Sequence, residues 1–184
     1  MAYYLGQVFG LVATALCMVA PFFKKKWQML VNTVLINSFL ALNYWLIGAM
    51  GSAFSMCVVA VIQAILTLIH VTTDTKVTLA EKIVFCALYV GCGFYGLVTA
   101  PGYVPGINSQ NLLELLPIAG AIFNMICVFV RDEQETRKFL LLNALAWCVY
   151  TAVIMSTSFF AEFFAAASSA IALYKYRKPR EKTK

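Results

Sequence analysis

Amide and aromatic side chains that fall inside long apolar stretches are the residues of this sequence best placed to do chemistry. In hydrocarbon a polar side chain is costly unless it meets a partner or a wet cavity. Amides, an indole and a phenol together suit the binding of an uncharged or zwitterionic small solute. The residues predicted to bind such a solute are Asn32, Asn43, Gln63, Asn124, Asn143, Trp147 and Tyr150.

The spacing of these residues places several of them on shared helix faces. Asn32 and Asn43 are three helical turns apart and therefore lie on one face. Asn143, Trp147 and Tyr150 follow i, i+4, i+7 spacing and form one stripe. The alternative is that the amides only bridge helices, each such hydrogen bond being worth about 0.6 kcal/mol. The sequence leaves both interpretations open.

Two acids and two prolines are candidates for gating or coupling. Glu114 and Glu162 each lie at the start of an apolar segment, away from the basic loops. A carboxylate at a helix N-terminus is favoured by the helix dipole, so capping is the alternative role. Pro21 and Pro117 are potential kinks. Pro117 could instead occupy a first helical turn, where its missing N–H costs nothing.

Catalytic and metal-binding motifs are absent from the sequence. It contains no HExxH, GxSxG or P-loop pattern, and its one histidine cannot complete an acid–His–nucleophile set. It also contains no CxxC pair or His–Cys cluster of the kind that holds zinc. We therefore expect no enzyme activity, no cofactor and no metal site.

The composition is that of an integral membrane protein in contact with a lipid bilayer. Of 184 residues, 62% are hydrophobic and 12% are charged, whereas soluble domains average about 45–50% and about 25%. Crossing a hydrocarbon core of about 30 Å takes roughly 20 apolar residues. The sequence predicts an all-α fold with seven transmembrane helices. Their apolar runs are residues 3–23, 28–47, 52–70, 79–98, 112–130, 139–155 and 159–174.

Lysine and arginine set the predicted orientation, because they remain on the cytoplasmic side. All 14 lysine and arginine residues lie at the connections after the first, third and fifth predicted helices or in the C-terminal tail. The N-terminus is therefore expected outside and the C-terminus in the cytoplasm. The net charge of +6 then suits anionic lipid and does not call for a nucleic acid partner. Tyr44 and Trp45, near an outer helix end, are expected in the interfacial aromatic belt.

Residues 112–173 read as a second copy of residues 5–69, with the run 79–98 alone between them. A three-helix unit ends on the side opposite its start, so one extra helix is needed before the unit can recur in the same orientation. The prediction is a 3+1+3 plan, a pattern known from transporters with solute sites between the repeats. Its parts are bundles at 1–74 and 101–176, a linker helix at 75–100 and a basic cytoplasmic tail at 177–184.

A family resemblance agrees with this plan. The stretch Glu-Leu-Leu-Pro-Ile-Ala-Gly-Ala-Ile at 114–122 resembles the corresponding stretch of the bacterial inner-membrane YgjV-type family. The 3+1+3 plan resembles the SWEET, PQ-loop and PnuC group of small transporters, the MtN3-like fold. The resemblance implies a multi-pass protein of the bacterial inner (plasma) membrane and names a fold more firmly than a substrate.

The expected function is passage of a small polar solute through a pocket between the two bundles, by alternating access of one bundle against the other. The absence of an ATP site and of a deeply buried acid favours facilitated diffusion. The alternative is a non-transporting assembly factor or partner subunit, and a homo-oligomer is compatible with either. A transporter requires a polar pocket near the midplane beside Asn32, Asn124, Asn143 and Trp147, whereas a structural subunit would be packed solid there.

Overall fold

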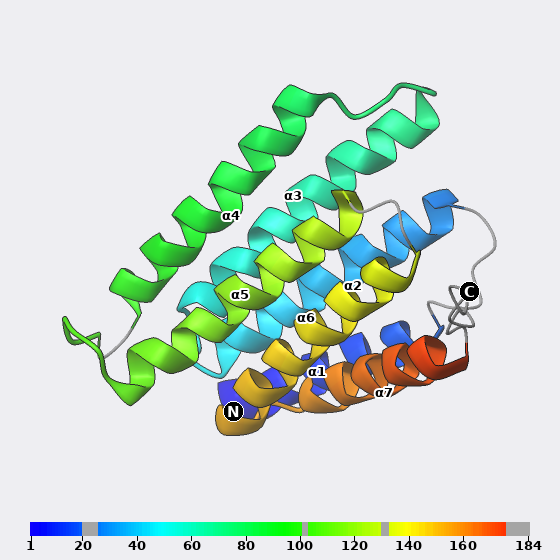
Figure 1. Ribbon diagram of the computed structural model, residues 1–184. Coiled ribbons are helices and arrows are strands. Elements are labelled where there is room, and N and C mark those ends of the chain that lie inside the picture. Colours follow the sequence, from blue (N-terminus) through cyan, green and yellow to red (C-terminus); the bar gives the residue numbers. More distant parts are fainter. Residues whose placement is uncertain (20–25, 101–102, 130–132, 176–184) are drawn as a thin grey trace, which may run out of the picture.

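The computed structural model describes residues 1–19, 26–100, 103–129 and 133–175, which form seven α-helices (Figure 1). The helices are α1 (Ala2–Val19), α2 (Lys26–Leu46), α3 (Ser52–Thr72), α4 (Leu79–Thr99), α5 (Ser109–Phe129), α6 (Glu133–Val153) and α7 (Phe159–Lys175). Their bounds follow the predicted apolar runs closely, except that α6 begins well ahead of its run. Pro21, the basic residues 24 and 25 and the tail 177–184 lie outside the described residues.

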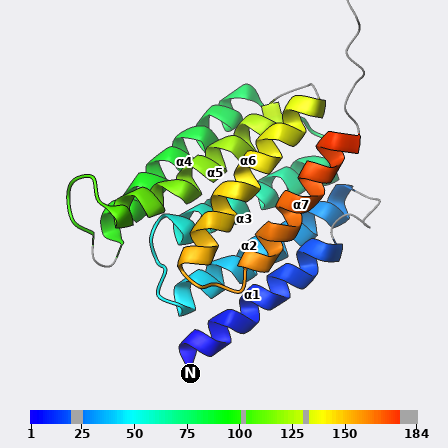
Figure 2. The same ribbon diagram turned by 60° about the horizontal axis from the view of Figure 1, so that its bottom comes forward.

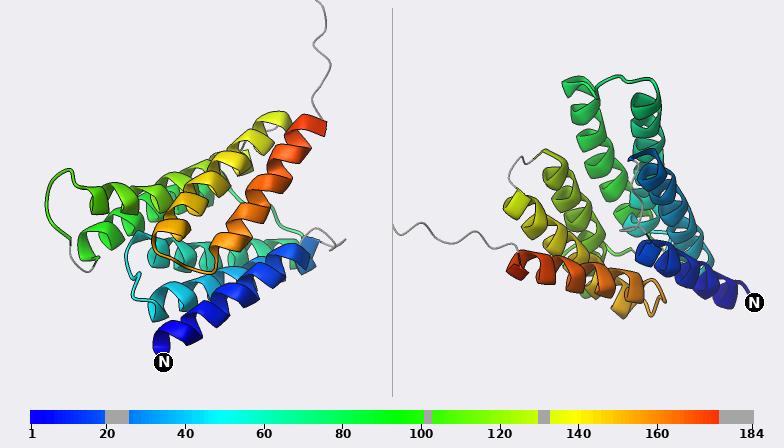
Figure 3. Two further views of the ribbon diagram at one scale, coloured as in Figure 1. Left: turned by 90° about the horizontal axis from the view of Figure 1, so that it is seen from below. Right: turned by 90° about the vertical axis from the view of Figure 1, so that its right-hand side faces the viewer.

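Six of the described helices form a closed ring of neighbours. In ring order these are α1, α2, α3, α5, α6 and α7, and α7 returns to α1. Helix α4 lies outside the ring and packs on α3 and α5, on the side away from α1 and α7 (Figure 1). Figure 2 shows α7 beside α1 at the edge opposite α4, and the two views of Figure 3 agree. The ring places side chains from six helices around a common centre.

Every described helix exposes large apolar side chains, as expected of a surface in contact with lipid. Examples are Leu11 on α1, Leu35 on α2, Ile62 on α3, Ile83 on α4 and Phe163 on α7. Helices α1, α3 and α4 are each long and apolar enough to cross a membrane. The apolar parts of α2 and α6 are shorter, at Leu30–Leu46 and Lys138–Val153, so the full set of seven spans stays a prediction.

The two ends of the bundle differ in charge. The end that holds the α3–α4 connection and the last turn of α7 carries the described basic residues, and we call it the basic end. These residues are Lys26, Lys76, Lys82, Arg137, Lys138 and Lys175. The end that holds Met1, the α2–α3 turn and the α6–α7 turn has no described lysine or arginine, and we call it the N-terminal end. Each helix runs from one end to the other.

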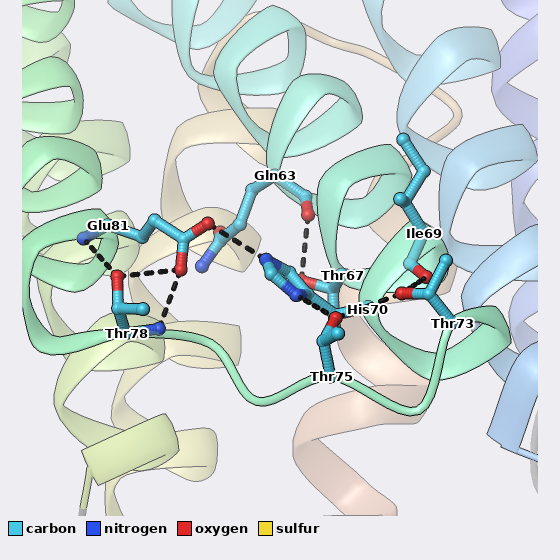
Figure 4. Close-up of polar contacts among 8 residues, drawn as sticks. All are labelled: Gln63, Thr67, Ile69, His70, Thr73, Thr75, Thr78 and Glu81. Atoms are coloured by element: carbon cyan, nitrogen blue, oxygen red, sulfur yellow. Dashed lines mark hydrogen bonds and ion pairs between the residues drawn. The ribbon is translucent and has the colours of Figure 1, made fainter.

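A capping box fixes the start of α4 at the basic end (Figure 4). The Thr78 hydroxyl accepts a hydrogen bond from the Glu81 N–H at 3.2 Å, and the Thr78 N–H donates to Glu81 Oε2 at 2.6 Å. This reciprocal pair satisfies two of the N–H groups that a helix start leaves unpaired. Glu81 also lies 2.8 Å from His70 Nε2 on α3, and so ties α4 to the preceding helix.

Replacing Thr78 with alanine should lower the stability of the protein by about 1 kcal/mol, the usual value of a lost N-cap. Thr72 is the matched control, because its hydroxyl bonds only to carbonyls of its own helix, those of Leu68 and Ile69. The measurement is thermal unfolding of the purified protein in detergent. Equal losses for Thr78→Ala and Thr72→Ala would mean that the capping box does not hold α4.

Candidate functional site

The N-terminal end is closed by a set of buried and partly buried, hydrogen-bonded polar groups that we call the end network. Its members are Gln7, Asn43, Tyr44, Ser52, Glu114, Tyr150, Ser156, Thr157 and Ser158. They come from α1, α2, α3, α5, α6 and the α6–α7 turn. Each interaction in the network joins segments that are far apart in the sequence or turns the chain between helices. The network therefore locks the six-helix ring at this end.

Asn43 is at the centre of the network and is fully buried. Its Nδ2 donates to the Gly6 carbonyl on α1 at 2.7 Å, and its Oδ1 accepts from Ser156 Oγ at 2.7 Å. Ser156 Oγ also lies 2.7 Å from Ser158 Oγ. Because both ends of the amide are paired, Asn43 bridges three segments, which is the helix-bridging role left open by the sequence.

Glu114 holds the N-terminus of α3, although it belongs to α5. Its Oε2 accepts from the Ser52 N–H at 2.8 Å, and the Ser52 hydroxyl lies 2.6 Å from both Glu114 Oε2 and the Glu114 carbonyl. Tyr150 Oη donates to Glu114 Oε1 at 3.3 Å. The carboxylate thus meets the positive end of another helix's dipole, in place of the capping of its own helix weighed from the sequence.

Gln7 of α1 makes the same kind of contact with the start of the last helix. The Thr157 N–H donates to Gln7 Oε1 at 2.7 Å, and the Thr157 hydroxyl donates to the Gln7 carbonyl at 2.6 Å. Gln7 Nε2 completes the contact by donating to the Met155 carbonyl at 2.8 Å. Two helices of the ring, α1 and α5, therefore each hold the chain entering a neighbouring helix.

Tyr44 corrects one expectation from the sequence. It is fully buried rather than in an interfacial belt, whereas Trp45 is about half exposed at 52%. The Tyr44 ring stacks on Trp147 with centroids 6.1 Å apart and meets Tyr150 edge-on at 6.2 Å. The two neighbours differ in burial because Tyr44 lies on the face of α2 that points into the helix ring, whereas Trp45 lies on the face that points outward.

A cavity of about 230 Å³ lies at mid-depth in the ring, beneath the end network. Its polar and aromatic lining consists of Thr33, Asn37, Tyr89, Asn124, Asn143, Trp147 and Glu162, with Cys57 among the apolar residues. Thr33 and Asn124, on the basic side, are exposed, while the groups that cover the cavity on the other side are buried. Asn143 Oδ1 is the only described buried side-chain nitrogen or oxygen without a hydrogen-bond partner.

The predicted binding residues divide into three groups. Asn124, Asn143 and Trp147 line the central cavity, together with the predicted gating residue Glu162. Asn32, Asn43 and Tyr150 bridge helices, Asn32 through a hydrogen bond from its Nδ2 to the Leu16 carbonyl. Gln63 lies apart, in a second cavity of about 460 Å³ at the basic end, and accepts a hydrogen bond from Tyr89.

Some residues of the site were not anticipated from the sequence. Asn37 and Tyr89 line the cavity, and Ser52 and Ser156 belong to the end network. Asn37 and Thr33 are four residues apart on α2, a spacing that marks one face. Pro117 is buried inside α5, so of its two predicted positions it takes the helix interior. Among described residues, no group of three His, Cys, Asp or Glu is placed to hold a metal ion.

Gly120 lets Trp147 lie against α5 at the wall of the cavity. A Cβ at position 120 would lie 2.7 Å from Trp147 Nε1 and 2.8 Å from its Cδ1, which is closer than real contacts allow. Gly120→Ala should therefore displace the indole and cost about 1–3 kcal/mol through overpacking. The matched control is Gly91→Ala on α4, where a Cβ meets nothing within 4 Å and better helix propensity should make the change neutral or stabilising.

Thermal unfolding and tryptophan fluorescence of the purified variants check this expectation. Gly120→Ala should unfold at a lower temperature and change the emission spectrum, while Gly91→Ala should do neither. If Gly120→Ala unfolds like the wild type with an unchanged spectrum, the indole does not depend on this glycine for its place.

Comparison with known proteins adds one assignment. Searches of curated proteins and of solved structures gave no match. A family model described as a bacterial inner membrane protein matches residues 4–180, almost the whole chain. That family places the protein in the bacterial inner membrane, in agreement with its long apolar helices and exposed apolar side chains. The chain therefore belongs to the Imp-YgjV family of bacterial inner membrane proteins.

Proposed function

We propose that this protein moves a small polar solute across the inner membrane through the central cavity, by facilitated diffusion with alternating access. The observation that carries the proposal is Asn143, whose Oδ1 is buried at the cavity wall without a hydrogen-bond partner. A buried polar atom left unpaired costs free energy, so it requires a functional reason. A hydrogen bond from a passing solute to Asn143 Oδ1 would be such a reason.

The two sides of the cavity support a pathway that is closed at one end. Toward the N-terminal end the cavity is covered by the end network, in which Asn43, Tyr44 and Ser158 are each fully buried. Toward the basic end its lining residues Thr33 and Asn124 are exposed. If the basic end faces the cytoplasm, as the distribution of lysine and arginine favours, this is an inward-facing state.

Related bundles on the two sides of the cavity would explain how it could open alternately. If α1 corresponds to α5 and α3 corresponds to α7, then the α1–α7 contact corresponds to the α5–α3 contact. A two-fold axis along the membrane normal would relate the two contacts in this way. The Gln7–Thr157 and Glu114–Ser52 contacts exchange in the same way. Helix α4 then has the place of a linker, and Gly93 lets it approach Ile118 of α5 closely.

The turns after α2 and α6 support the same relationship in detail. The N–H groups of Ile47, Gly48 and Ala49 donate to the carbonyls of Asn43, Trp45 and Tyr44, and those of Ile154, Met155 and Ser156 donate to Tyr150, Ala152 and Thr151. Every donor and acceptor recurs 107 positions later, as from 47 to 154. Gly48 and Met155, which correspond, both have positive φ, 82° and 51°. Positive φ is uncommon for a non-glycine residue such as Met155, so its occurrence at the position that corresponds to Gly48 supports the relationship.

In the proposed cycle the end network breaks and reforms. Separation of α1 from the α6–α7 turn and of α5 from α3 would uncover the cavity at the N-terminal end, while the bundles close at the basic end. The hydrogen bonds that must break involve groups that can bond to water instead. The opening would therefore exchange hydrogen bonds with protein for hydrogen bonds with water, at modest net cost.

Flux into proteoliposomes tests the proposal. The purified chain is reconstituted and exposed to labelled nucleosides, vitamins, sugars, amino acids and amines. At least one solute should enter faster than into protein-free liposomes, with saturation, and should show counterflow. If every solute enters at the protein-free rate and none binds the purified protein, the cavity does not serve transport and a structural subunit is the better account.

A further inference from the structure

Among the described residues that line the central cavity, Glu162 on α7 is the single charged group, whereas the sequence led us to expect no acid deep in the membrane. No described residue donates a hydrogen bond to this carboxylate or forms an ion pair with it. The described lysines lie at the basic end, whereas Glu162 is in the first turn of α7, near the N-terminal end. The protein therefore brings a negative charge to the cavity without a described cation to balance it.

An unbalanced carboxylate at membrane depth is unfavourable, because a low-dielectric surrounding does not replace its hydration. The charge must be met by a positive ion from solution or removed by a proton. The end network covers the cavity on the side of Glu162, so access is through the exposed residues on the basic side. An occupant that reaches Glu162 therefore passes Asn143 and Trp147 on the way.

The rest of the lining suits an organic cation better than a bare metal ion. Among described residues no group of three acidic, histidine or cysteine side chains is gathered there. Trp147 and Tyr89 line the cavity, and the faces of aromatic rings attract ammonium and guanidinium groups. Trp147 is held in place by its stacking on Tyr44. Asn143 Oδ1 is a second hydrogen-bond acceptor, and no described residue donates a hydrogen bond to it.

We propose that the solute taken by this cavity is a small organic cation bearing N–H donors, an ammonium or guanidinium ion, paired with Glu162 and hydrogen-bonded to Asn143. The proposal rests on the proposed function, and it narrows the small polar solute to a cation, in place of the uncharged or zwitterionic solute expected from the sequence. The positive charge would form an ion pair with the Glu162 carboxylate, and the N–H groups would donate hydrogen bonds to the Asn143 amide oxygen. An anion would meet Glu162 with like charge.

Matched probes on the full chain in lipid nanodiscs test this assignment. Butylammonium and agmatine are the cations with N–H donors, tetramethylammonium is a cation without them, and 1-butanol and butyrate are the neutral and anionic counterparts of butylammonium. Isothermal titration at pH 7 should rank butylammonium and agmatine first, tetramethylammonium lower, and the other two lowest. Glu162→Gln should weaken butylammonium binding by about tenfold or more, since a charged hydrogen bond is lost.

The control variant is Glu135→Gln, which changes a carboxylate at the basic end that pairs with Lys138. It should leave the ranking unchanged, and both variants should unfold at temperatures close to the wild type. The assignment is overturned if butyrate or butanol binds as well as butylammonium, or if Glu162→Gln binds all the cations as the wild type does. It is also overturned if Glu162 only takes up a proton while no amine binds.

The flux panel separates failure of this assignment from failure of transport. If a neutral or anionic solute crosses proteoliposomes and the amines do not, the proposed function stands and the cation assignment is wrong. If no solute of any charge crosses or binds, both are wrong.

Discussion

Replacing Glu114 with alanine is expected to destabilise the protein by about 3 kcal/mol and to loosen its N-terminal end. The carboxylate accepts from the Ser52 N–H and hydroxyl and from Tyr150 Oη, all in a buried setting. Hydrogen bonds to a charged group are worth about 1.5–3 kcal/mol each, and their loss leaves buried donors unpaired. Thermal unfolding in detergent measures the first effect, and hydrogen exchange at the start of α3 measures the second.

Glu114→Gln is the matched control and should keep most of the stability. Gln7 makes the equivalent contacts to Thr157, with its side-chain oxygen accepting from the Thr157 N–H and its backbone carbonyl accepting from the Thr157 hydroxyl. A carboxamide at position 114 can therefore accept a hydrogen bond from the Ser52 N–H in the same way. If the glutamine variant is as unstable as the alanine variant, the charge itself holds α3. If both variants unfold like the wild type, Glu114 does not hold the two helices together.

Leucine at position 143 is expected to abolish solute flux while leaving the stability within about 1 kcal/mol of the wild type, the usual range where no network is broken. Asn143 Oδ1 has no hydrogen-bond partner among the described residues. An apolar side chain of similar volume therefore breaks no described hydrogen bond to that atom. The solute, in contrast, loses its hydrogen bond at the cavity wall. Flux into proteoliposomes and thermal unfolding are measured on the same preparation.

The same substitution at Asn43 should give the opposite pattern in stability. Asn43→Leu removes the two hydrogen bonds that join Asn43 to the Gly6 carbonyl and to the Ser156 hydroxyl, at a cost of about 2 kcal/mol for the two buried bonds. A large loss of stability for Asn143→Leu, equal to that for Asn43→Leu, would mean that both amides merely bridge helices and that the cavity has no solute to bind.

The sequence predicts the helices well because their signal is local. The runs that become α3 and α4 begin at Ser52 and Leu79, the positions where the helices begin, since apolar length and loop composition are both read along the chain. Helix α6 starts earlier than its apolar run because the polar residues that precede the run, from Glu133 on, belong to the helix. Such residues have helix propensity but no apolar signature.

The candidate site is predicted only in part, because its contacts depend on which distant segments meet. The polarity of Asn143 and Trp147 marks them as candidates, but nothing local separates Asn143, unpaired at a cavity, from Asn43, paired on both sides. The difference lies in Gly6 and Ser156, which are 37 and 113 positions from Asn43. Tyr44 and Trp45 show the same limit, since adjacent positions on a helix face opposite environments.

The most direct measurement of the central claim is the chemical accessibility of a cysteine at position 143. In a variant with the native cysteines replaced by alanine, Asn143→Cys is treated with a membrane-impermeant thiol reagent from each side of oriented vesicles. Leu142→Cys, whose side chain faces outward, is the control. A wet cavity inside the helix ring requires that position 143 be labelled from the basic side and position 142 from neither. If position 143 is as unreactive as position 142 from both sides, the ring is packed dry and no solute passes through it.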